Sequence, residues 1–389
     1  MSPGLRGRLT RLVAAQVSLH AAMAGLRLAA PLLALREGHS ALAVGVLMAL
    51  FALSQVFLAL PAGRFTDRHG LHRPMRLAVA VALTGGTLAV IWPVYLVLCV
   101  AALCAGAASG LSLIALQRYV GTLADGPAGL RQVFSAMSTG PAIANVVGPF
   151  LAGLVIDLAG FRAAFFALAC LPPLALLALR TVPEAPPRPA PDTGTRRASR
   201  ELLALPGFRR LLVVNWLLSS CWDVHTFVVP VLGHERGFSA SVIGTLLGAF
   251  AVAAALIRIS LHWVARQLHE HQIIGGAMLA TGVLFGLYPF MPNAWAMGAC
   301  SVLLGLVLGS AQPMIMSTLH QITPEHRQGE ALGLRLLSIN ASSVLMPSLF
   351  GLAGAVAGVA PVFWVVGAAV GLGARTAWRM GHTQPPAGP

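Results

Sequence analysis

Long apolar segments alternate with short polar stretches along the whole chain of 389 residues. A bilayer core of about 30 Å is crossed by a helix of about 20 apolar residues, and hydropathy predicts about twelve such helices in this sequence. Their approximate spans are 12-35, 40-62, 75-95, 97-119, 131-156, 160-181, 208-232, 239-263, 272-291, 294-319, 330-356 and 358-378. The pattern therefore predicts an all-α integral membrane protein.

The composition supports a membrane location, because 57% of the residues are hydrophobic and only 10% are charged. That is too little polar surface to coat a soluble globule of this size. A net charge of +14 would suggest a nucleic-acid partner in a soluble protein, but the positions of the arginines argue against one. Only Arg36, Arg162 and Arg236 fall in predicted outer loops, and Arg27 lies within a span, whereas the other arginines flank the opposite ends. This bias predicts that both termini are cytoplasmic, in a bacterial inner membrane.

The beginning of the chain and the cysteines add two expectations. Arg6, Arg8 and Arg11 precede an apolar run, as in a cleavable signal peptide, but the run is too long and its polar residues recur in the second half. We therefore expect a first membrane helix there. All five cysteines lie inside predicted helices, which argues against a disulfide framework: Cys99, Cys104, Cys170, Cys221 and Cys300.

A repeat relates the two halves of the sequence. One constant offset pairs residues across several predicted helices: Pro31 with Pro230, Gly38 with Gly237, Ser40 with Ser239, Gly45 with Gly244, Phe51 with Phe250, Pro93 with Pro292, Gly106 with Gly305 and Gly110 with Gly309. The repeat predicts two related six-helix halves, 1-182 and 207-389. Residues 183-206 are rich in Pro and Arg and are expected to form an extended cytoplasmic linker, with a regulatory docking site there as a second interpretation.

The stretch Gly63-Arg64-Phe65-Thr66-Asp67-Arg68-His69-Gly70-Leu71-His72-Arg73 lies between the second and third spans. It resembles the cytoplasmic loop signature of the major facilitator superfamily, with matches at Gly63, Asp67, Arg68, Gly70 and Arg73. Phe65 and Thr66 are mild departures, and Leu71 stands where a basic residue is usual. Gly63 would allow close helix contact and Gly70 a tight turn. The resemblance implies that Asp67 meets helix 11 and nearby arginines and latches the two halves; a merely solvated loop is the alternative.

A second element, Gly148-Pro149-Phe150-Leu151-Ala152-Gly153, is similar to the helix 5 motif of the proton-coupled antiporters in that superfamily. Gly148, Pro149 and Gly153 are expected to form a bend packed against a partner helix. The arginine usual in helix 4 of those antiporters is replaced by Ala102, which puts the usual proton coupling in doubt. The stretches Gly160–Phe165 and Pro324–Gly329 also look like loop signatures of the superfamily.

Polar residues inside the spans predict the substrate and proton pathway, because an ionisable group in the bilayer usually faces a cavity or a partner. Helix 1 carries Gln16, His20 and Arg27 on one face, and helix 7 carries Asn215, Ser219, Asp223 and Thr226. The resemblance implies that helices 1, 4, 7 and 10 line a central path. Further candidates are Gln117, Trp222 as a stacking platform, Gln312 with Ser310, and His320.

Asp223 is the best candidate for a proton carrier, because it is the only acidic residue well inside a predicted span. The alternative is a structural ion pair between Arg27 and Asp223. We expect His225 to be a packed histidine and Arg258 to extend toward the membrane surface. The His269-Glu270-His271 triplet is too short for a metal site, so neither a metal nor another cofactor is expected.

The sequence thus resembles a major facilitator transporter, closest in motif content to the twelve-helix drug:proton antiporters. This resemblance implies a secondary active transporter that works by alternating access and exports drug-like or small amphiphilic compounds against proton entry. Transport of a small organic anion or metabolite, in either direction, is the alternative. An enzyme is disfavoured, because the chain has no nucleotide loop, zinc spacing or nucleophile motif.

Overall fold

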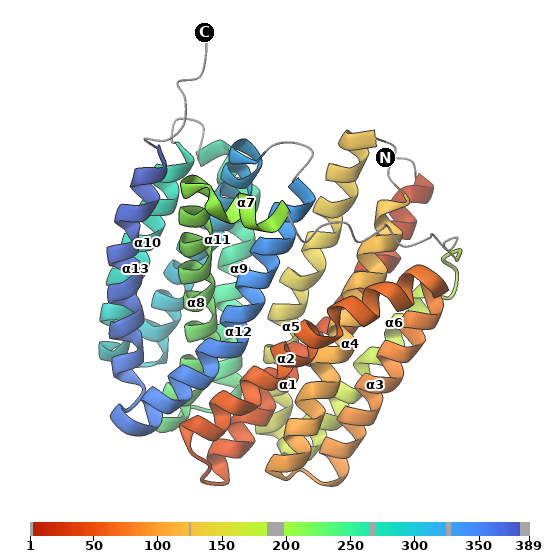
Figure 1. Cartoon of the computed structure of the whole chain (residues 1–389). Coiled ribbons are helices and arrows are strands. Elements are labelled where there is room, and N and C mark those ends of the chain that lie inside the picture. Colours follow the sequence, from red (N-terminus) through yellow and green to blue (C-terminus); the bar gives the residue numbers. More distant parts are fainter. Residues whose placement is uncertain (1–2, 124–125, 185–197, 265–268, 324–327, 382–389) are drawn as a thin grey trace. The chain divides into compact units, whose positions relative to one another are not determined.

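The computed structural model describes residues 3–123, 126–184, 198–264, 269–323 and 328–381, and these residues form helices joined by short connections. The first six helices are α1 (Pro3–Arg36), α2 (Ala41–His69), α3 (His72–Ile91), α4 (Tyr95–Gly121), α5 (Gly126–Ala169) and α6 (Leu171–Leu179). They are followed by α7 (Ala198–Ala204), α8 (Pro206–Glu235), α9 (Ala240–Val264), α10 (Glu270–Leu287), the short 3-10 helix η1 (Tyr288–Phe290), α11 (Ala294–Ile322), α12 (Gln328–Ala357) and α13 (Ala360–Gly381) (Figure 1).

Eleven described helices are long and apolar enough to cross a membrane. One of them, Ala136–Leu179, is 44 residues long and is interrupted at Gly160, where φ is 85° and ψ is 176°. Because glycine adopts this positive φ without strain, Gly160 separates two passes. The eleven helices therefore provide twelve passes, as the hydropathy predicts.

Contacts divide the chain into two compact units. The first contains the described residues of Met1–Pro191 together with Gly233–Gly248, and the second contains those of Asp192–Leu232 and Ala249–Pro389. The loop between α8 and α9, with the first turns of α9, thus packs with the first unit. Within that unit, the side chain of Asp157 accepts hydrogen bonds from the backbone N–H groups of Ala240 (3.0 Å) and Ser241 (2.8 Å). It therefore caps the first turn of α9.

Equivalent contacts recur in the two units at the positions paired by the sequence repeat. A Cβ at Gly106 would overlap the carbonyl oxygen of Phe51, and a Cβ at Gly305 would overlap that of Phe250. Gly38 and Gly237 both have positive φ, 83° and 72°. The duplication therefore preserves the same close helix contact, which only glycine permits.

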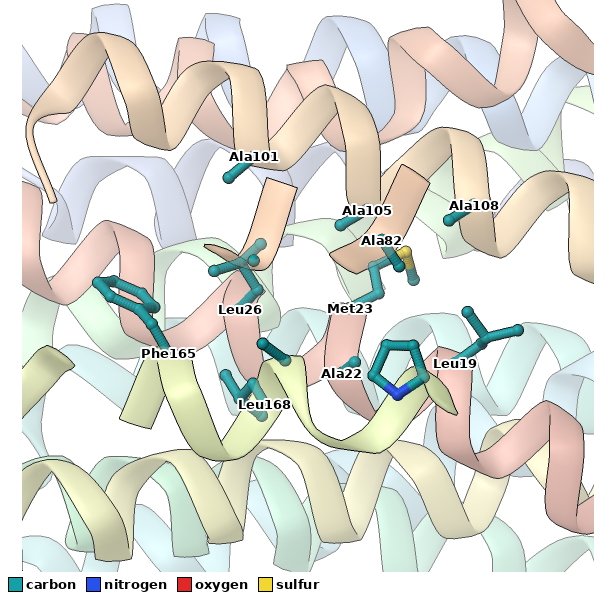
Figure 2. A pocket seen from close by; sticks show the side chains of 13 residues that line it. Leu19, Ala22, Met23, Leu26, Ala82, Ala101, Ala105, Ala108, Phe165 and Leu168 are labelled. Atoms are coloured by element: carbon teal, nitrogen blue, oxygen red, sulfur yellow. The ribbon is translucent and has the colours of Figure 1, made fainter. Parts of the chain in front are cut away.

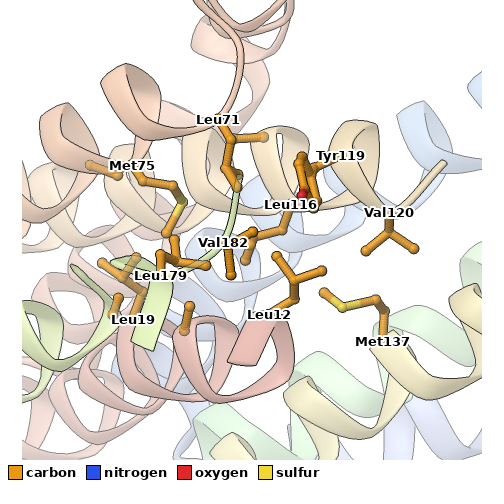
Figure 3. Close-up of a cluster of buried hydrophobic side chains, with 14 of the residues drawn as sticks. Leu12, Leu19, Leu71, Met75, Leu116, Tyr119, Val120, Met137, Leu179 and Val182 are labelled. Atoms are coloured by element: carbon orange, nitrogen blue, oxygen red, sulfur yellow. The ribbon is translucent and has the colours of Figure 1, made fainter. Parts of the chain in front are cut away.

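The core of the first unit lies where α1, α3, α4 and α6 converge. Figure 3 shows Leu12, Met75, Tyr119 and Leu179 from these helices in one cluster with Leu71. The side chain of Leu71 is fully buried in this cluster. This burial of apolar area explains why position 71 carries leucine where the loop signature usually has a basic residue.

Two expectations about local structure differ from the fold. α5 remains helical through Pro141 and Pro149, and among its residues only Gly160 has a non-helical backbone, so the bend predicted at Pro149 is not a break in the helix. The close packing predicted there is present. A Cβ at Gly148 would overlap the backbone of α1, and one at Gly153 would overlap the carbonyl oxygen of Ala240.

The linker is also more structured at its ends than its composition indicates. Residues 185–197 lie outside the described residues, but Ala198–Ala204 forms α7, with Leu202 buried. Burial of this leucine provides the apolar contact that a short helix needs for stability. At the other end, Val182, the residue just before the linker, is buried in the cluster that contains Leu71.

Candidate functional site

The polar face predicted for α1 is largely buried within the first unit. Gln16 is buried and lies against Gly140 of α5. His20 Nδ1 lies 3.3 Å from Ser109 Oγ of α4, and the side chain of Asn145 on α5 also bonds to His20. Polar groups from α4 and α5 thus lie near His20 of α1. The sequence interpretation selected neither Ser109 nor Asn145.

The polar face predicted for α8 is buried in the second unit. Asn215 is 0% exposed, and neither polar atom of its amide has a hydrogen-bond partner among the described residues. Ser219 is buried, whereas the Thr226 hydroxyl donates to the backbone carbonyls of Trp222 and Asp223. Asn215 is therefore the α8 residue with the most unused hydrogen-bonding capacity, which a bound ligand or water could satisfy.

Asp223 is 5% exposed and is held by two consecutive serines of α12. Ser342 Oγ donates to Asp223 Oδ2 at 2.9 Å, and Ser343 Oγ donates to Oδ1 at 3.2 Å. Ser342 is itself 3.1 Å from Ser220 Oγ of α8. The carboxylate thus belongs to a hydrogen-bonded network that joins α8 to α12.

Trp222 is already in contact with a cation, which the sequence interpretation did not foresee. The Arg258 guanidinium lies 5.7 Å from the centre of the Trp222 ring, close enough for a cation–π interaction. The Phe250 ring forms a T-shaped contact with the same ring, with centroids 4.6 Å apart. Arg258 therefore reaches toward α8, because the indole offers a favourable site for its charge, while its extension to the membrane surface stays a prediction.

His225 is a packed histidine, as expected. It is fully buried, stacks on Phe250 with centroids 4.0 Å apart, and its Nε2 lies 3.0 Å from Ser301 Oγ. Ser301 in turn lies 2.8 Å from the Tyr288 hydroxyl. The ring therefore joins α8, α9, α11 and η1.

The pathway residues predicted on α4 and α11 are less enclosed. Gln117 and His320 are exposed. Gln312 is half-buried and accepts a hydrogen bond of 2.5 Å from the Arg335 guanidinium of α12, while the Ser310 hydroxyl bonds to the backbone of its own helix. The structure thus brings an arginine to Gln312 that sequence reasoning did not select.

The predicted latch motif is mostly helical, because α2 continues to His69 and only Gly70 forms the turn. Gly70 has φ 71° and its N–H bonds to the Thr66 carbonyl, which confirms the turn predicted there. Asp67 is paired with Arg118 of α4, with 2.7 Å between Oδ1 and Nε. A Cβ at Gly63 would meet nothing within 4 Å among the described residues, so the close helix contact expected there stays a prediction.

Glu184, at the beginning of the linker, also contacts this motif. Its carboxylate accepts backbone hydrogen bonds from Leu71 and His72 and lies 2.8 Å from His72 Nδ1. Burial raises the pKa of Glu184, but these hydrogen bonds and the charge of His72 outweigh that effect and lower the pKa below its ordinary 4.5. Glu184 therefore caps the N-terminus of α3, which has no side-chain cap of its own.

Some of the predicted features have other roles or fall outside the described part of the chain. His269 caps α10 together with Gln272, and Glu270 accepts hydrogen bonds from Ser317 and Gln321. Residues 324–327 of the stretch Pro324–Gly329 lie outside the described residues. All five cysteines are free; four of them lie inside helices, and Cys170 lies between α5 and α6.

The polar groups that sequence reasoning missed had weak signals. Ser342 and Ser343 form a polar pair within an apolar helix, but the resemblance directed attention to helices 1, 4, 7 and 10. Arg118 was interpreted only as one of the arginines that set the topology. Each of these residues becomes significant through a partner on another helix, which the sequence of one helix does not reveal.

One pocket of the first unit is too small for a substrate. Figure 2 shows Leu19, Met23 and Leu26 of α1 facing Ala105 of α4 and Leu168 of α5. The space has a volume of about 30 Å³, enough for about two or three waters at about 10–15 Å³ each. Because its lining is apolar, it does not provide the partners that a bound water needs.

Comparisons to known proteins agree with the fold. The chain is 28% identical over 358 residues to the tetracycline resistance protein, class C, of Escherichia coli, covering 87% of each chain. It is 24% identical to multidrug resistance protein 1 of Bacillus subtilis (strain 168), covering 87% of this chain and 88% of the relative. A bacterial homolog of the human lysosomal transporter Spinster, solved in an inward-facing and occupied conformation, has the same fold, with a TM-score of 0.81, 13% identity and full coverage of both chains.

The match to a family model assigns the chain to a family. The model of the Major Facilitator Superfamily matches residues 12–274 and 211–388, which together span nearly the whole chain. With its twelve membrane passes, duplicated helix contacts and Gly63–Arg73 motif, this chain belongs to the Major Facilitator Superfamily and is a multi-pass membrane transporter of small molecules, not an enzyme.

Proposed function

We propose that this transporter exports drug-like or small amphiphilic compounds in exchange for protons, with Asp223 as the proton carrier. Efflux is supported by two relatives that cover most of the chain and are named for resistance to tetracycline and to multiple drugs. In the proposed cycle the two halves rock around a central site, so that access alternates between the two sides of the membrane.

The observation that carries proton coupling is the environment of Asp223. The residue is 5% exposed and bonds to the hydroxyls of Ser342 and Ser343. A hydroxyl can donate to a carboxylate and can also accept from a carboxylic acid. Both protonation states of Asp223 can therefore keep a hydrogen bond, which a group that gains and loses a proton in every cycle requires.

The test replaces Asp223 with asparagine, which keeps the size of the side chain and removes its titration. Asp223→Asn should abolish proton-driven efflux in proteoliposomes yet retain substrate binding and substrate exchange. Glu37→Gln, a neutralised carboxylate at the exposed end of α1, is the matched control and should keep proton-driven efflux. Full proton-driven efflux by Asp223→Asn would refute the proposed role.

If Asp223 instead forms a structural ion pair with Arg27, the expected effect of Asp223→Asn is different. Removing Asp223 would then leave a buried charge without its partner, at a cost of about 3–5 kcal/mol, and Asp223→Asn would lose thermal stability. The double variant Arg27→Gln, Asp223→Asn would recover that stability. If it also recovered proton-driven transport, Asp223 would be eliminated as the proton carrier.

One observation favours the second candidate, transport of a small organic anion. Arg335 donates a hydrogen bond of 2.5 Å to Gln312, a residue of the predicted pathway, and thus brings a positive charge to it. An anionic cargo would be attracted to that guanidinium. A panel of cationic, neutral and anionic compounds, screened by thermal stabilisation of the purified protein, separates the two candidates: stabilisation by anions alone, lost in Arg335→Gln, would favour the anion transporter.

A further inference from the structure

An apolar cavity lies within the second unit between α8, α12 and α13, which are labelled in Figure 1. Its volume is about 460 Å³, within the range of about 300–1,000 Å³ typical of small-molecule sites. Buried side chains form its inner wall: Ser220 of α8, Met346 and Phe350 of α12, and Val362 of α13. The cavity is thus large enough for a drug-sized apolar compound.

The outer wall of the cavity consists of exposed apolar side chains. Leu349, Val356 and Val365 line it and are 52%, 83% and 68% exposed. In a membrane protein such side chains face acyl chains rather than water. The cavity is therefore accessible to compounds dissolved in the hydrocarbon of the bilayer.

A hydrogen-bonded chain leads from the cavity wall to the proposed proton carrier. Ser220 Oγ donates to the Trp216 carbonyl at 2.8 Å and lies 3.1 Å from Ser342 Oγ. Ser342 donates to Asp223 Oδ2 at 2.9 Å. Ser220 is therefore the polar residue of the inner wall, and Asp223 lies two hydrogen bonds away from it.

The two serines cannot satisfy all three links when Asp223 is ionised. Each hydroxyl has one proton, and the chain contains three links: Trp216 to Ser220, Ser220 to Ser342, and Ser342 to Asp223. A protonated Asp223 supplies the missing proton, so that Asp223 donates to Ser342, Ser342 to Ser220 and Ser220 to Trp216. When Asp223 is ionised, Ser342 donates to the carboxylate, and Ser220 must choose between Ser342 and Trp216. The orientation of the Ser220 hydroxyl thus depends on the proton of Asp223.

We propose that this cavity is a second ligand site, which binds an uncharged lipophilic compound from the bilayer through an apolar body and a hydrogen-bonding group placed at Ser220. Binding there is coupled to the protonation of Asp223 through Ser220 and Ser342. The coupling rests on the proposed function, whereas binding itself does not. A lipid acyl chain is the less suitable occupant, since it has no group to bond to Ser220.

The experiment measures saturable binding of Nile red, an uncharged lipophilic dye with hydrogen-bond acceptors, to the purified full-length protein. Ala369→Trp, at a lining position, should weaken Nile red binding by about tenfold or more. The added indole would take up cavity space that the dye needs. Ala368→Trp is the matched control, since Ala368 is also exposed but does not line the cavity. Ala353→Leu with Ala355→Leu is a second pair of the same design on α12, for use if a tryptophan variant does not fold.

Equal affinity in the lining and control variants of a folded pair would overturn the proposed site. Quenching of Trp216 by lipids brominated on their acyl chains, measured against Trp216→Phe and not relieved by Nile red, would identify a lipid as the occupant and would also overturn it. For the coupling, Nile red affinity should depend on pH in the wild type and lose that dependence in Ser220→Ala; an unchanged pH dependence would overturn the coupling. None of these measurements requires transport. A negative result for the second site can therefore be distinguished from a negative result for the proposed efflux.

Discussion

Ser342 of α12 donates a hydrogen bond of 2.9 Å to the Oδ2 atom of Asp223 on α8. The two residues are 119 positions apart in the sequence, and both are buried. This bond ties the strongest proton-carrier candidate to a helix that the sequence interpretation did not assign to the pathway.

The first prediction concerns this pair. Ser342→Ala should reduce proton-driven transport by about tenfold, because a hydrogen bond to a charged group contributes about 1.5–3 kcal/mol. Ser343→Ala should have a smaller effect, since its bond to Asp223 is longer, at 3.2 Å. Ser338→Ala, in the same helix and half-buried like Ser343, is the control. Equal losses in Ser342→Ala and Ser338→Ala, measured as initial rates in proteoliposomes, would show that the bond has no specific role.

The second prediction concerns the latch that the resemblance implies for Asp67. Asp67→Asn should leave membrane insertion intact while cutting transport severely, because it breaks the pair with Arg118 and removes the charge needed for the proposed latch. Arg118→Gln should reproduce the part of the defect that arises from the pair. Arg64→Gln, an exposed arginine in the same motif, should have little effect. Transport by Asp67→Asn at nearly the wild-type rate would rule out the latch.

The third prediction uses the duplicated glycine contact. Gly106→Ala and Gly305→Ala should each destabilise the protein by about 1–3 kcal/mol, because the added methyl group overlaps a carbonyl oxygen of the neighbouring helix. Gly276→Ala should be tolerated, since a Cβ there would meet nothing within 4 Å. Thermal unfolding in detergent measures all three. If Gly276→Ala were as destabilising as the other two variants, the close contact would not be the cause.

The fourth prediction follows from the lowered pKa of Glu184. A carboxylate whose pKa is lower in the folded state stabilises the protein above its unfolded pKa, here 4.5, and this contribution is lost as the pH falls below that value. Glu184→Gln should therefore lower the melting temperature at pH 7 and reduce the difference in stability between pH 7 and pH 4. The effect should stay below about 1 kcal/mol, because the carboxylate is 47% exposed and screened by solvent. An unchanged difference between the two pH values would exclude this cap as its source.

The fifth prediction tests the orientation that the arginines predict. In a cysteine-free background, Thr195→Cys in the linker should react with a membrane-permeant maleimide in intact cells and not with an impermeant one. Reaction with the impermeant reagent from outside would reverse the predicted topology. A cysteine at Arg236, in a predicted outer loop, is the positive control for the impermeant reagent.

The sequence by itself determined the number of membrane passes, the duplication and the turn at Gly70. Hydropathy depends on the local run of apolar residues, and a positive φ depends on the residue that adopts it, so each of these features can be read within one helix or one turn. The repeat could also be read directly, because one constant offset aligns Gly106 with Gly305 and Phe51 with Phe250, and the glycine–phenylalanine contact recurs at both places.

The tertiary structure alone decided which polar groups meet. The spacing of Asp223 along α8 shows which face of that helix it occupies, but Ser342 becomes its partner only through the packing of α12. Arg118 reaches Asp67 and Arg258 reaches Trp222 for the same reason. Long side chains on separate helices meet according to the rotation and spacing of both helices, and the periodicity of either helix alone specifies neither quantity.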